Sequence, residues 1–388
     1  MRIFAVLPRS PNAGLPDSLT WYRNLGEPLL DLGHDVVFAP LQSGIEARRT
    51  NDARKRHHFS EQLLAHFRKE HSQKHFDLFF GYFMDGMVEP AAIDEIRRSG
   101  VPCCNFSCNN IHQFSLTEKL APHFDCNLHS ERAARQKFLD IGATPLWWPM
   151  AANPRYFRPC ELSRTVPVSF LGANYALRSR YVLALLHEGV DVHVYGPGWL
   201  GGARNGLRSR LLRYLLLARA LAAGKNDEYR ASAKLAEHDL RRLLFARFPD
   251  HLQGPLNDDQ AIRLYSRSEL VLGFVEVHEN HDPSLPLRRH IHLREFEVPM
   301  CRAAYCTGYV EELAELYDLD KEVIIYRSED ELVDRTKFYL SRPELLESVR
   351  AAGYRRALAC HTYHKRYEDL FARIGLSQEQ RICIPQSR

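Results

Sequence analysis

The segment HLREFEVPMC, residues 292–301, followed by the apolar run AAYC at residues 303–306, predicts a short helix that leads directly into a small strand. A polar, proline-rich loop is expected just before it, over residues 276–286. Residues three positions apart in a helix lie one turn apart on one face, so the Arg294 and Glu297 side chains should point the same way. This helix and its strand are the expected centre of the second half of the chain.

A cation and a carboxylate placed in this way suit the two ends of a nucleoside diphosphate. The planar guanidinium of an arginine binds phosphate oxygens, and a glutamate accepts hydrogen bonds from a ribose diol. The same spacing also fits an ordinary surface salt bridge, which is the commoner arrangement. The surroundings of Arg294 and Glu297 decide between these two interpretations.

Short apolar runs alternate with helical patterns on both sides of this centre. In the first half, strands are expected at Arg2–Leu7, His34–Ala39, Phe76–Phe83, Val101–Ser107, Phe124–His129 and Pro145–Trp148. In the second half, they are expected at Val166–Gly172, Asp191–Tyr195, Glu269–Val275, Ala303–Tyr305 and Glu322–Tyr326. Alternation at this spacing predicts an α/β fold with a parallel, doubly wound sheet in each half.

The alternation breaks near residues 159–165, where prolines interrupt it. We therefore expect two Rossmann-like domains, residues 1–162 and 163–388, with the last helices packing back on the first domain. Two such domains facing across a cleft would hold a ligand among the loops at the carboxyl ends of their strands.

Composition narrows the class of protein. The 388 residues can bury a core in each of two domains. A net charge of +4 fits an anionic substrate or membrane surface and gives no indication of a nucleic-acid partner. The apolar run at the N-terminus is too short for a signal peptide and no later segment is long and apolar enough to span a membrane, so a cytoplasmic protein is expected. The nine cysteines fit reduced thiols.

Five short motifs follow one another between residues 166 and 370. They are Phe170-Leu171-Gly172 with Arg178, Val194-Tyr195-Gly196 with Trp199, Leu293-Arg294-Glu295-Phe296-Glu297, Val323–Tyr326 with Glu331-Leu332, and Gly353-Tyr354-Arg355 with His361-Thr362-Tyr363 and Arg366. With these motifs the chain resembles glycosyltransferases of the GT-B fold, group 1 type, and most closely the CgeB-like group of spore maturation proteins. The first half matches more loosely, through residues 20–25 and 32–35.

The resemblance implies that the C-terminal domain binds a nucleoside-diphosphate sugar and that the N-terminal domain binds the acceptor. Carried over to this sequence, the resemblance implies that Glu297 would bind the ribose hydroxyls and that Arg294 and Arg178 would bind the diphosphate. Gly172 lets the backbone approach the donor closely, and Gly196 belongs to the same donor site. The helix that carries Arg178 would also direct its N-terminal peptide dipoles at the phosphates.

The expected reaction is displacement at the anomeric carbon of the sugar. Fixed positive charge from the arginines would stabilise the leaving diphosphate, so neither a metal nor a cofactor is expected. A base near the acceptor hydroxyl is still required. His112 is the first candidate because some group-1 relatives have a histidine after the comparable strand, and Asp85 is the second. A purely structural role is the alternative for each.

Two residues depart from the family pattern. Arg289 stands where many group-1 transferases have a second glutamate, eight residues before Glu297, which leaves a retaining or an inverting outcome open. Arg302 stands where a glycine commonly follows the helix, and we expect it to be exposed rather than a phosphate contact.

Two other enzymatic and binding interpretations remain. A nucleotide-sugar epimerase of the same fold would need carboxylates on both sides of the cleft, and a non-catalytic nucleotide-sugar-binding protein would explain Arg289. The acceptor of a transferase is unknown; a glycan, a lipid-linked glycan or a protein of the cell envelope or spore surface would fit.

Metal and membrane sites were weighed as well. Cys103, Cys104, Cys108 and His112 fit no zinc-binding spacing, and the histidines at 278, 281, 290 and 292 are better explained as loop or substrate-facing residues. The arginine- and leucine-rich segment 207–224 suits peripheral contact with an anionic membrane, at the inner face, although packing on its own domain is favoured.

Overall fold

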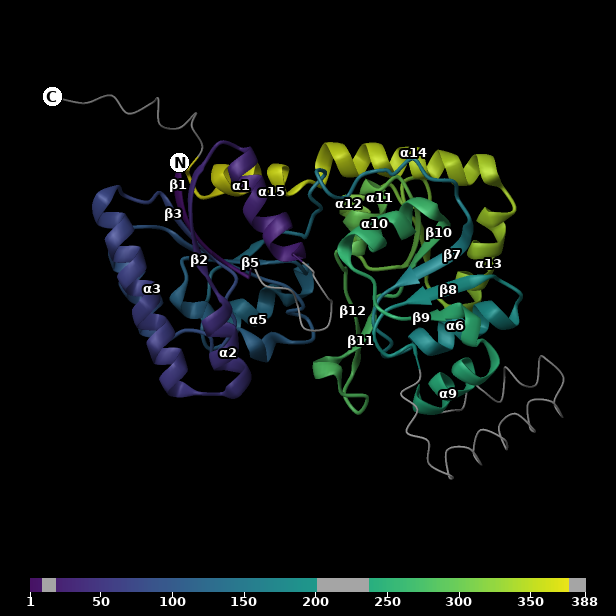
Figure 1. Cartoon of the computed structure of the whole chain (residues 1–388), viewed down its shortest axis with the longest axis horizontal. Coiled ribbons are helices and arrows are strands. Elements are labelled where there is room, and N and C mark those ends of the chain that lie inside the picture. Colours follow the sequence, from purple (N-terminus) through teal and green to yellow (C-terminus); the bar gives the residue numbers. More distant parts are fainter. Residues whose placement is uncertain (9–18, 201–236, 377–388) are drawn as a thin grey trace. The chain divides into compact units, whose positions relative to one another are not determined.

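The computed structural model describes residues 1–8, 19–200 and 237–376 (Figure 1). These residues form two compact units. The first contains the N-terminal strand, Leu19–Tyr156 and the residues from Ala359 onward, and the second contains Phe157–Leu358. The assignment of acceptor and donor binding to the two halves, and the boundary at residues 162 and 163, stay predictions.

The first unit is built on a parallel sheet of six strands in the order β2-β1-β3-β4-β5-β6. The strands are β1 (Arg2–Leu7), β2 (Asp35–Pro40), β3 (Leu78–Gly81), β4 (Cys103–Ser107), β5 (Cys126–His129) and β6 (Pro145–Trp147). Every residue of β1 is buried, as expected for a central strand covered on both faces. All six strands were predicted from the sequence, with bounds that differ by two residues or fewer.

Helices complete the first unit. They are α1 (Glu27–Asp31), α2 (Gln42–Thr50), α3 (Ala53–Gln73), α4 (Pro90–Arg98), α5 (Arg135–Asp140) and α15 (Tyr363–Arg373), with a π-helical turn at Tyr22–Gly26 and 3-10 turns at Phe114–Leu116, Ala121–His123 and Arg132–Ala134. The Asp52 carboxylate starts α3 by accepting from the Arg54 and Lys55 N–H groups at 2.9 and 3.2 Å. Gly100 and Gly142 follow α4 and α5 with φ angles of 83° and 74°, as helix-ending glycines do.

The C-terminal helix α15 belongs to the first unit. The Trp148 indole N–H donates to the Arg366 carbonyl at 2.8 Å, and the Tyr367 hydroxyl donates to the Leu25 carbonyl at 2.6 Å. The Tyr367 ring also meets the Phe80 ring edge-on, with centroids 5.5 Å apart. Aromatic packing and buried hydrogen bonds therefore fix α15 to residues that precede it by more than two hundred positions.

The second unit has its own parallel sheet of six strands, in the order β14-β13-β10-β7-β8-β9. The strands are β7 (Val166–Leu171), β8 (Val192–Tyr195), β9 (Leu252–Gln253), β10 (Ser268–Gly273), β13 (Ala304–Gly308) and β14 (Ile324–Tyr326). The helices are α6 (Arg178–His187), α9 (Glu237–Arg247), α10 (Asp258–Arg267), α11 (Arg294–Met300), α12 (Leu313–Leu316), α13 (Glu329–Leu340) and α14 (Pro343–Cys360), with 3-10 turns at Pro249–His251 and Glu279–His281.

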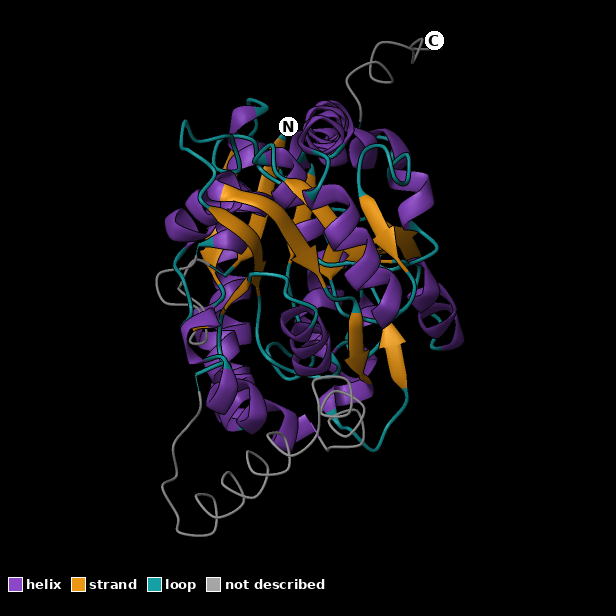
Figure 2. Cartoon of the chain, turned by 90° about the vertical axis from the view of Figure 1, so that its right-hand side faces the viewer, coloured by secondary structure: helices purple, strands orange, loops and turns teal. Residues whose placement is uncertain are grey.

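The predicted loop at residues 276–286 is wrong in part. Two short antiparallel strands, β11 (Glu276–His278) and β12 (Leu287–Arg289), form a hairpin that is not part of the six-stranded sheet (Figure 2). The prolines that indicated a loop, Pro283 and Pro286, lie in the connection between the two strands. Glu276 pairs with Arg289 across the hairpin at 3.2 Å. This ion pair gives the departure at Arg289 a structural role.

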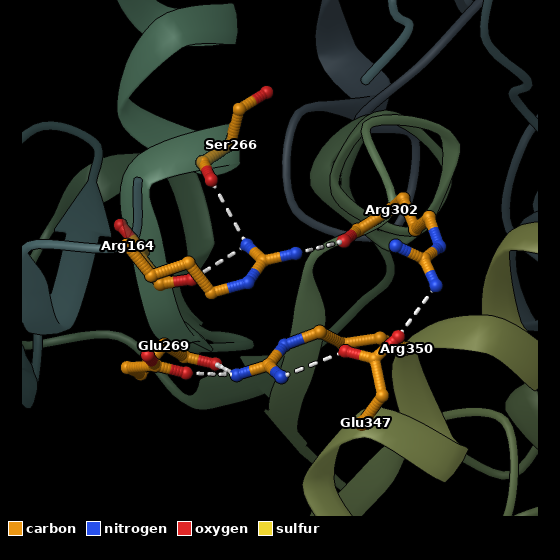
Figure 3. A network of polar contacts seen from close by, with 7 residues as sticks. Arg164, Ser266, Glu269, Arg302, Glu347 and Arg350 are labelled. Atoms are coloured by element: carbon orange, nitrogen blue, oxygen red, sulfur yellow. Dashed lines mark hydrogen bonds and ion pairs between the residues drawn. The ribbon is translucent and has the colours of Figure 1, made fainter. Parts of the chain in front are cut away.

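An arginine network anchors the end of α11 to α14 and to the strands (Figure 3). Arg164 donates to the carbonyls of Ser266 and Arg302, at 2.9 and 3.1 Å. Arg350 binds the Glu269 carboxylate and, at 3.1 Å, the Glu347 carboxylate, which also pairs with Arg302. We refer to Arg164, Arg302 and Arg350 with these partners as the arginine network.

Arg302 itself follows α11 with a φ of 53°. Glycine adopts this left-handed conformation without strain, whereas a residue with a Cβ such as Arg302 adopts it less readily. The Arg302 side chain is about half exposed, and its guanidinium is paired with Glu347 rather than directed at the glycine loop after β7.

No helix among the described residues is long and apolar enough to cross a membrane. The arginine- and leucine-rich segment 207–224 lies outside those residues.

Candidate functional site

Two glycines bring the loops after β7 and β8 together. The Gly172 N–H donates to the Tyr195 carbonyl at 2.8 Å, and the Gly172 carbonyl accepts from the Trp199 indole at 2.7 Å. Gly196 has a φ of 138°, and a Cβ there would lie 2.4 Å from the Gly172 carbonyl oxygen. Only glycine permits such an approach of two backbones. Gly172 and Gly196 therefore shape one edge of the sheet, at the carboxyl ends of neighbouring parallel strands.

Gly172 also lies beside two predicted phosphate-binding arginines. A Cβ on Gly172 would be 3.2 Å from Nη1 of Arg178 and 3.2 Å from Nη1 of Arg294. The same Cβ would be 2.8 Å from the end of the Phe170 ring. Two guanidinium groups from different helices thus converge on one glycine, and we call Arg178 and Arg294 the arginine pair.

Arg178 is the first residue of α6, and only 2% of its surface is exposed. It donates to the Ala173 carbonyl at 2.6 Å, the Tyr175 hydroxyl at 2.7 Å and the Phe274 carbonyl at 3.2 Å. Its guanidinium carbon lies 3.7 Å from the centre of the Tyr175 ring. Burial lowers the pKa of Arg178 to about 10, and the like charge of Arg294 acts in the same direction. The group remains positively charged at neutral pH.

Arg294 is the first residue of α11 and has two of the three guanidinium nitrogens of the arginine pair that lack a hydrogen-bond partner among the described residues, the third being Nε of Arg178. Its Nε and Nη2 atoms are buried, and within the described parts of the chain neither has a hydrogen-bond partner. Its guanidinium carbon lies 5.4 Å from the centre of the Phe170 ring. Buried donors normally have partners because an unpaired one costs roughly 1–3 kcal/mol, more if charged. A cationic group left in this state favours an anionic ligand.

Glu297 lies one turn along α11 from Arg294 and is 7% exposed. Burial raises the pKa of its carboxyl to about 8, Arg294 opposes the rise, and Asp258 and Glu295 add to it. No residue that the structure describes donates a hydrogen bond to this carboxyl or forms an ion pair with it within 4.0 Å. The surface salt bridge between Arg294 and Glu297, the commoner interpretation of their spacing, is therefore wrong.

Glu295, between these two residues, has a structural role that the sequence did not indicate. Its carboxylate accepts from the His292 N–H at 2.7 Å, the Thr307 hydroxyl at 3.2 Å and the Tyr305 hydroxyl at 3.3 Å. Its carbonyl accepts from the Tyr317 hydroxyl at 2.7 Å. These bonds tie α11 to β13 and so set the positions of the two flanking residues. No local pattern distinguishes Glu295 from Glu297; only the partners on β13 do.

The structure thus brings Gly172, Gly196, Arg178 and Arg294 together, with Glu297 on the same short helix as Arg294. Tyr175 was missed by sequence reasoning, although it follows Gly172 by three positions in the same loop. His292 was expected to be a loop or substrate-facing histidine, and its Nε2 lies 3.5 Å from the Arg178 guanidinium.

The candidate base residues lie in the first unit. His112 follows β4 and is 2% exposed. The loop that carries it is held by Glu131, whose carboxylate accepts from the N–H groups of Asn109 and Asn110 at 2.7 and 3.1 Å. Sequence reasoning missed Glu131, which comes from the segment after β5. This carboxylate positions the turn into His112.

Asp85, the second candidate, follows β3. Its two carboxylate oxygens accept from the N–H groups of Lys119 and Leu120, at 3.0 and 2.9 Å. Burial raises the pKa of the Asp85 carboxyl, and these two hydrogen bonds oppose the rise. The carboxylate therefore caps the segment that leads into β5, and this role leaves it less free to accept a proton from a substrate.

Neither metal site weighed from the sequence is formed by the described residues. No three of the histidines at 278, 281, 290 and 292 place ligand atoms within 4.8 Å of one another, and no three of Cys103, Cys104, Cys108 and His112 do so. One other group does: Asp191, His193 and His251 place one ligand atom each within 4.8 Å of the others. It lies at the opposite ends of the strands from the glycine loops.

A sequence-family model described as "Glycosyl transferase-like" matches residues 178–372, half of the chain. The chain belongs to this family. The matched segment of this glycosyl transferase-like protein begins at Arg178 and includes Arg294 and Glu297. None of the curated proteins compared with it matches.

Several solved structures resemble the whole of this glycosyl transferase-like chain. Sucrose-phosphate synthase from Thermosynechococcus elongatus is 11% identical, with a TM-score of 0.59 over 96% of this chain and 99% of that one. HepE from Anabaena in complex with UDP is 10% identical, with a TM-score of 0.56 over 96% and 99%. A Listeria monocytogenes protein described as a UDP-N-acetylglucosamine 2-epimerase is 9% identical, with a TM-score of 0.52 over 98% of both chains. These likenesses establish the GT-B fold, two Rossmann-like units with parallel sheets.

Proposed function

We propose that this protein is a metal-independent glycosyltransferase that moves a sugar from a nucleoside-diphosphate sugar to an acceptor hydroxyl. The observation that carries the proposal is the convergence of Arg178 and Arg294 on Gly172, with buried guanidinium donors on Arg294 that have no partner among the described residues. A diphosphate would supply oxygens to those donors and negative charge to both arginines.

The expected contact with the ribose of the nucleotide sugar follows from the position of Glu297 on α11. Glu297 would accept hydrogen bonds from the ribose hydroxyls, and for that its carboxyl must give up its proton. Burial raises the pKa of this carboxyl to about 8 in the empty protein. Hydroxyl donors lower the pKa of a carboxylate that accepts from them, so donor binding should favour the ionised form. HepE, which has the same fold, is solved with UDP bound, and this supports a uridine nucleotide as the first donor to try.

Groups of this chain can account for the bond changes, the negative charge and the proton of the proposed reaction. The bond between the anomeric carbon and the diphosphate oxygen breaks, and the acceptor oxygen forms a new bond to that carbon. The arginine pair stabilises the negative charge that develops on the leaving diphosphate, in the place that a metal takes in other enzymes. The acceptor proton passes to a base, for which His112 is the better candidate because both Asp85 oxygens already accept backbone hydrogen bonds.

The epimerase is the second candidate, and the fold alone does not separate it from the transferase, since one neighbour of that description shares it. An epimerase must handle a proton next to the anomeric carbon with side chains on both sides of the sugar. Asp85 is one of the two carboxylates that such a mechanism would use, and its oxygens already accept hydrogen bonds from two backbone N–H groups. This makes Asp85 less available as a base. The non-catalytic alternative rested on Arg289, which the Glu276 ion pair explains on structural grounds.

We also propose the narrower placement that the motifs suggest: a CgeB-like enzyme of the cytoplasm, in peripheral contact with the inner membrane face through residues 207–224, that glycosylates a cell-envelope or spore-surface acceptor. The resemblance of the motifs supports the group, and the composition of the segment supports the membrane contact.

The test is incubation of the purified protein with a panel of nucleoside-diphosphate sugars, followed by analysis of both products. Slow release of nucleoside diphosphate with a free sugar is the expected result, because a transferase without its acceptor transfers to water. Conversion of the sugar to an epimer would favour the second candidate. If a nucleoside-diphosphate sugar binds but is not converted, even in the presence of candidate acceptors, the proposal that this protein is an enzyme would be refuted.

A further inference from the structure

The cluster Asp191, His193 and His251 lies at the amino ends of β8 and β9, away from the glycine loops. Asp191 and His193 are two positions apart at the start of β8, so their side chains project from the same face. That face is opposite to the one on which Val192 and Val194 are buried. The carboxylate and the imidazole are therefore outside the core.

His251 reaches the same point from the next strand. β8 and β9 are parallel with Val194 beside Leu252, and the same register one residue earlier sets His193 beside His251. The two imidazole rings have centroids 5.0 Å apart. Three side chains with metal-binding atoms, from two adjacent strands, thus share one small region of surface.

The distances suit a small cation. Oδ1 of Asp191 lies 2.9 Å from Nε2 of His193 and 3.5 Å from Nδ1 of His251. In a tetrahedral site with metal–ligand distances near 2.0–2.1 Å, neighbouring ligand atoms are about 3.3 Å apart. Nδ1 of His251 is also 3.1 Å from the Val192 carbonyl, and an ion bound at Nδ1 would displace this hydrogen bond, because one imidazole nitrogen cannot hold a proton and a metal ion at once. Small rotations of these partly exposed side chains would close the set around an ion.

One carboxylate oxygen lies near two imidazoles whose ring centres are 5.0 Å apart. A divalent cation accepts the lone pairs of two neutral imidazoles and neutralises the carboxylate. Two nitrogens and one oxygen with an open fourth position are ligands that Zn²⁺ prefers.

We propose that Asp191, His193 and His251 bind a divalent zinc-like cation that fastens the edge strand β9 to β8. β9 is only two residues long, Leu252–Gln253, and a cross-link at its start would compensate for its few hydrogen bonds. The ion has a structural role in this proposal. The donor site lies at the other end of β8, where Tyr195 leads into Gly196, so the transferase chemistry stays independent of it.

The test is calorimetric titration of the chelator-treated full-length protein with zinc chloride. We expect one equivalent to bind in the micromolar range or tighter, and zinc to raise the Tm. Asp191→Asn, His193→Gln and His251→Gln should each weaken zinc binding about tenfold or more and reduce the rise in Tm. His57→Gln/His58→Gln, which alters two exposed neighbouring histidines on α3, is the matched control and should bind like the parent.

Asp191→Asn keeps the test decisive if a histidine variant fails to fold, because the Asp191 side chain is 51% exposed and the substitution preserves its shape. The same variant should keep the full Tm response to the nucleoside diphosphate that the parent binds. Zinc affinity that is unchanged in Asp191→Asn and in the folded histidine variants would overturn the proposal, as would binding no tighter than millimolar in the parent.

Discussion

The second unit contains two groups of arginines that differ in what surrounds them. In the arginine network, Arg350 binds the carboxylates of Glu269 and Glu347, and Arg164 donates to backbone carbonyls (Figure 3). In the arginine pair, Arg178 donates to carbonyl and hydroxyl groups and lies 3.5 Å from the His292 imidazole, and within the described residues Arg294 has no hydrogen-bond partner for two of its nitrogens.

Aromatic faces take the place of carboxylates around the pair. Arg178 lies over Tyr175 and Phe170, and Arg294 lies over Phe170. A ring face stabilises a cation without using its N–H groups, so those groups stay available. The comparison teaches that burial of an arginine says little about its role; the presence of a counterion separates a structural arginine from one prepared for an anionic ligand.

The largest expected effect is a change of folding stability with pH, caused by the carboxyl of Glu297, which lies one helical turn from Arg294. Burial raises the pKa of its carboxyl from 4.5 to about 8, so the folded protein retains a proton that the unfolded chain releases near pH 4.5. The resulting stability is fully present below pH 4.5 and is lost as the pH rises towards 8. The loss should be on the order of 4 kcal/mol.

Urea unfolding between pH 5 and 9 measures this effect. Glu297→Gln should match the parent near pH 5 and exceed it in free energy of unfolding near pH 9, because the amide has no proton to lose. Parallel curves for the two proteins would contradict the raised pKa.

Removal of one member of the pair should abolish donor binding while the fold survives. Arg294→Met keeps the apolar bulk of the side chain and removes its charge-assisted hydrogen bonds to phosphate, at a cost of about 3 kcal/mol or roughly 100-fold in Kd. The Tm of the empty protein should stay the same or rise, since a buried like charge next to Arg178 is gone. Calorimetry with the nucleoside diphosphate that the parent binds gives the affinity. Undiminished binding would contradict the assignment of the arginine pair to an anionic ligand.

The same substitution in the network should have the opposite pattern. Arg350→Met leaves the Glu269 carboxylate without this cation and the Glu347 carboxylate with Arg302 alone, and because the two carboxylates are 40% and 45% exposed they regain water in part. We expect a loss of about 2 kcal/mol in the free energy of unfolding, with Kd for the nucleotide within twofold of the parent. A variant that lost affinity without losing stability would show that the two groups are not separate.

The smallest expected effect is at the glycine between the arginines. Gly172→Ala adds a methyl group 3.2 Å from both Nη1 atoms and 2.8 Å from the Phe170 ring, so the guanidinium groups must shift by a few tenths of an ångström. Nucleotide affinity should fall by about 1 kcal/mol, or roughly fivefold. Gly254→Ala is the matched control, because among the described residues a Cβ there would meet only Leu200, at 3.5 Å. Equal effects of the two substitutions would argue against a ligand beside Gly172.

The fold was predictable because both sheets are parallel and buried. Strands such as β1 and β10 appear as continuous apolar runs, and glycines with positive φ, such as Gly33, Gly100 and Gly189, mark where helices end. The β11–β12 hairpin was not predictable in the same way. Its strands have three residues each, and the prolines between them indicate only a connection.

The site was predictable only where a motif exists. The motifs identified Gly172, Arg178 and Arg294, which the structure brings together, but they do not show that Glu295 is bonded to β13 or that Glu131 holds the His112 loop. Those roles depend on partners that are far away in the sequence. The Asp191, His193 and His251 cluster shows the same limit, since a search for neighbouring histidines in the sequence found other groups, and the register of β8 and β9 defines this one.

The attachment of α15 has a consequence for anyone who wishes to study the first unit in isolation. A fragment that stops at Tyr156 would leave the Trp148 indole and the Leu25 carbonyl without their partners Arg366 and Tyr367. Excision, or exchange with the corresponding half of a relative, therefore requires two separate pieces of the gene. A chimaera with one crossover between the units pairs the α15 of one parent with the N-terminal half of the other, so two crossovers are needed to keep these contacts within one parent.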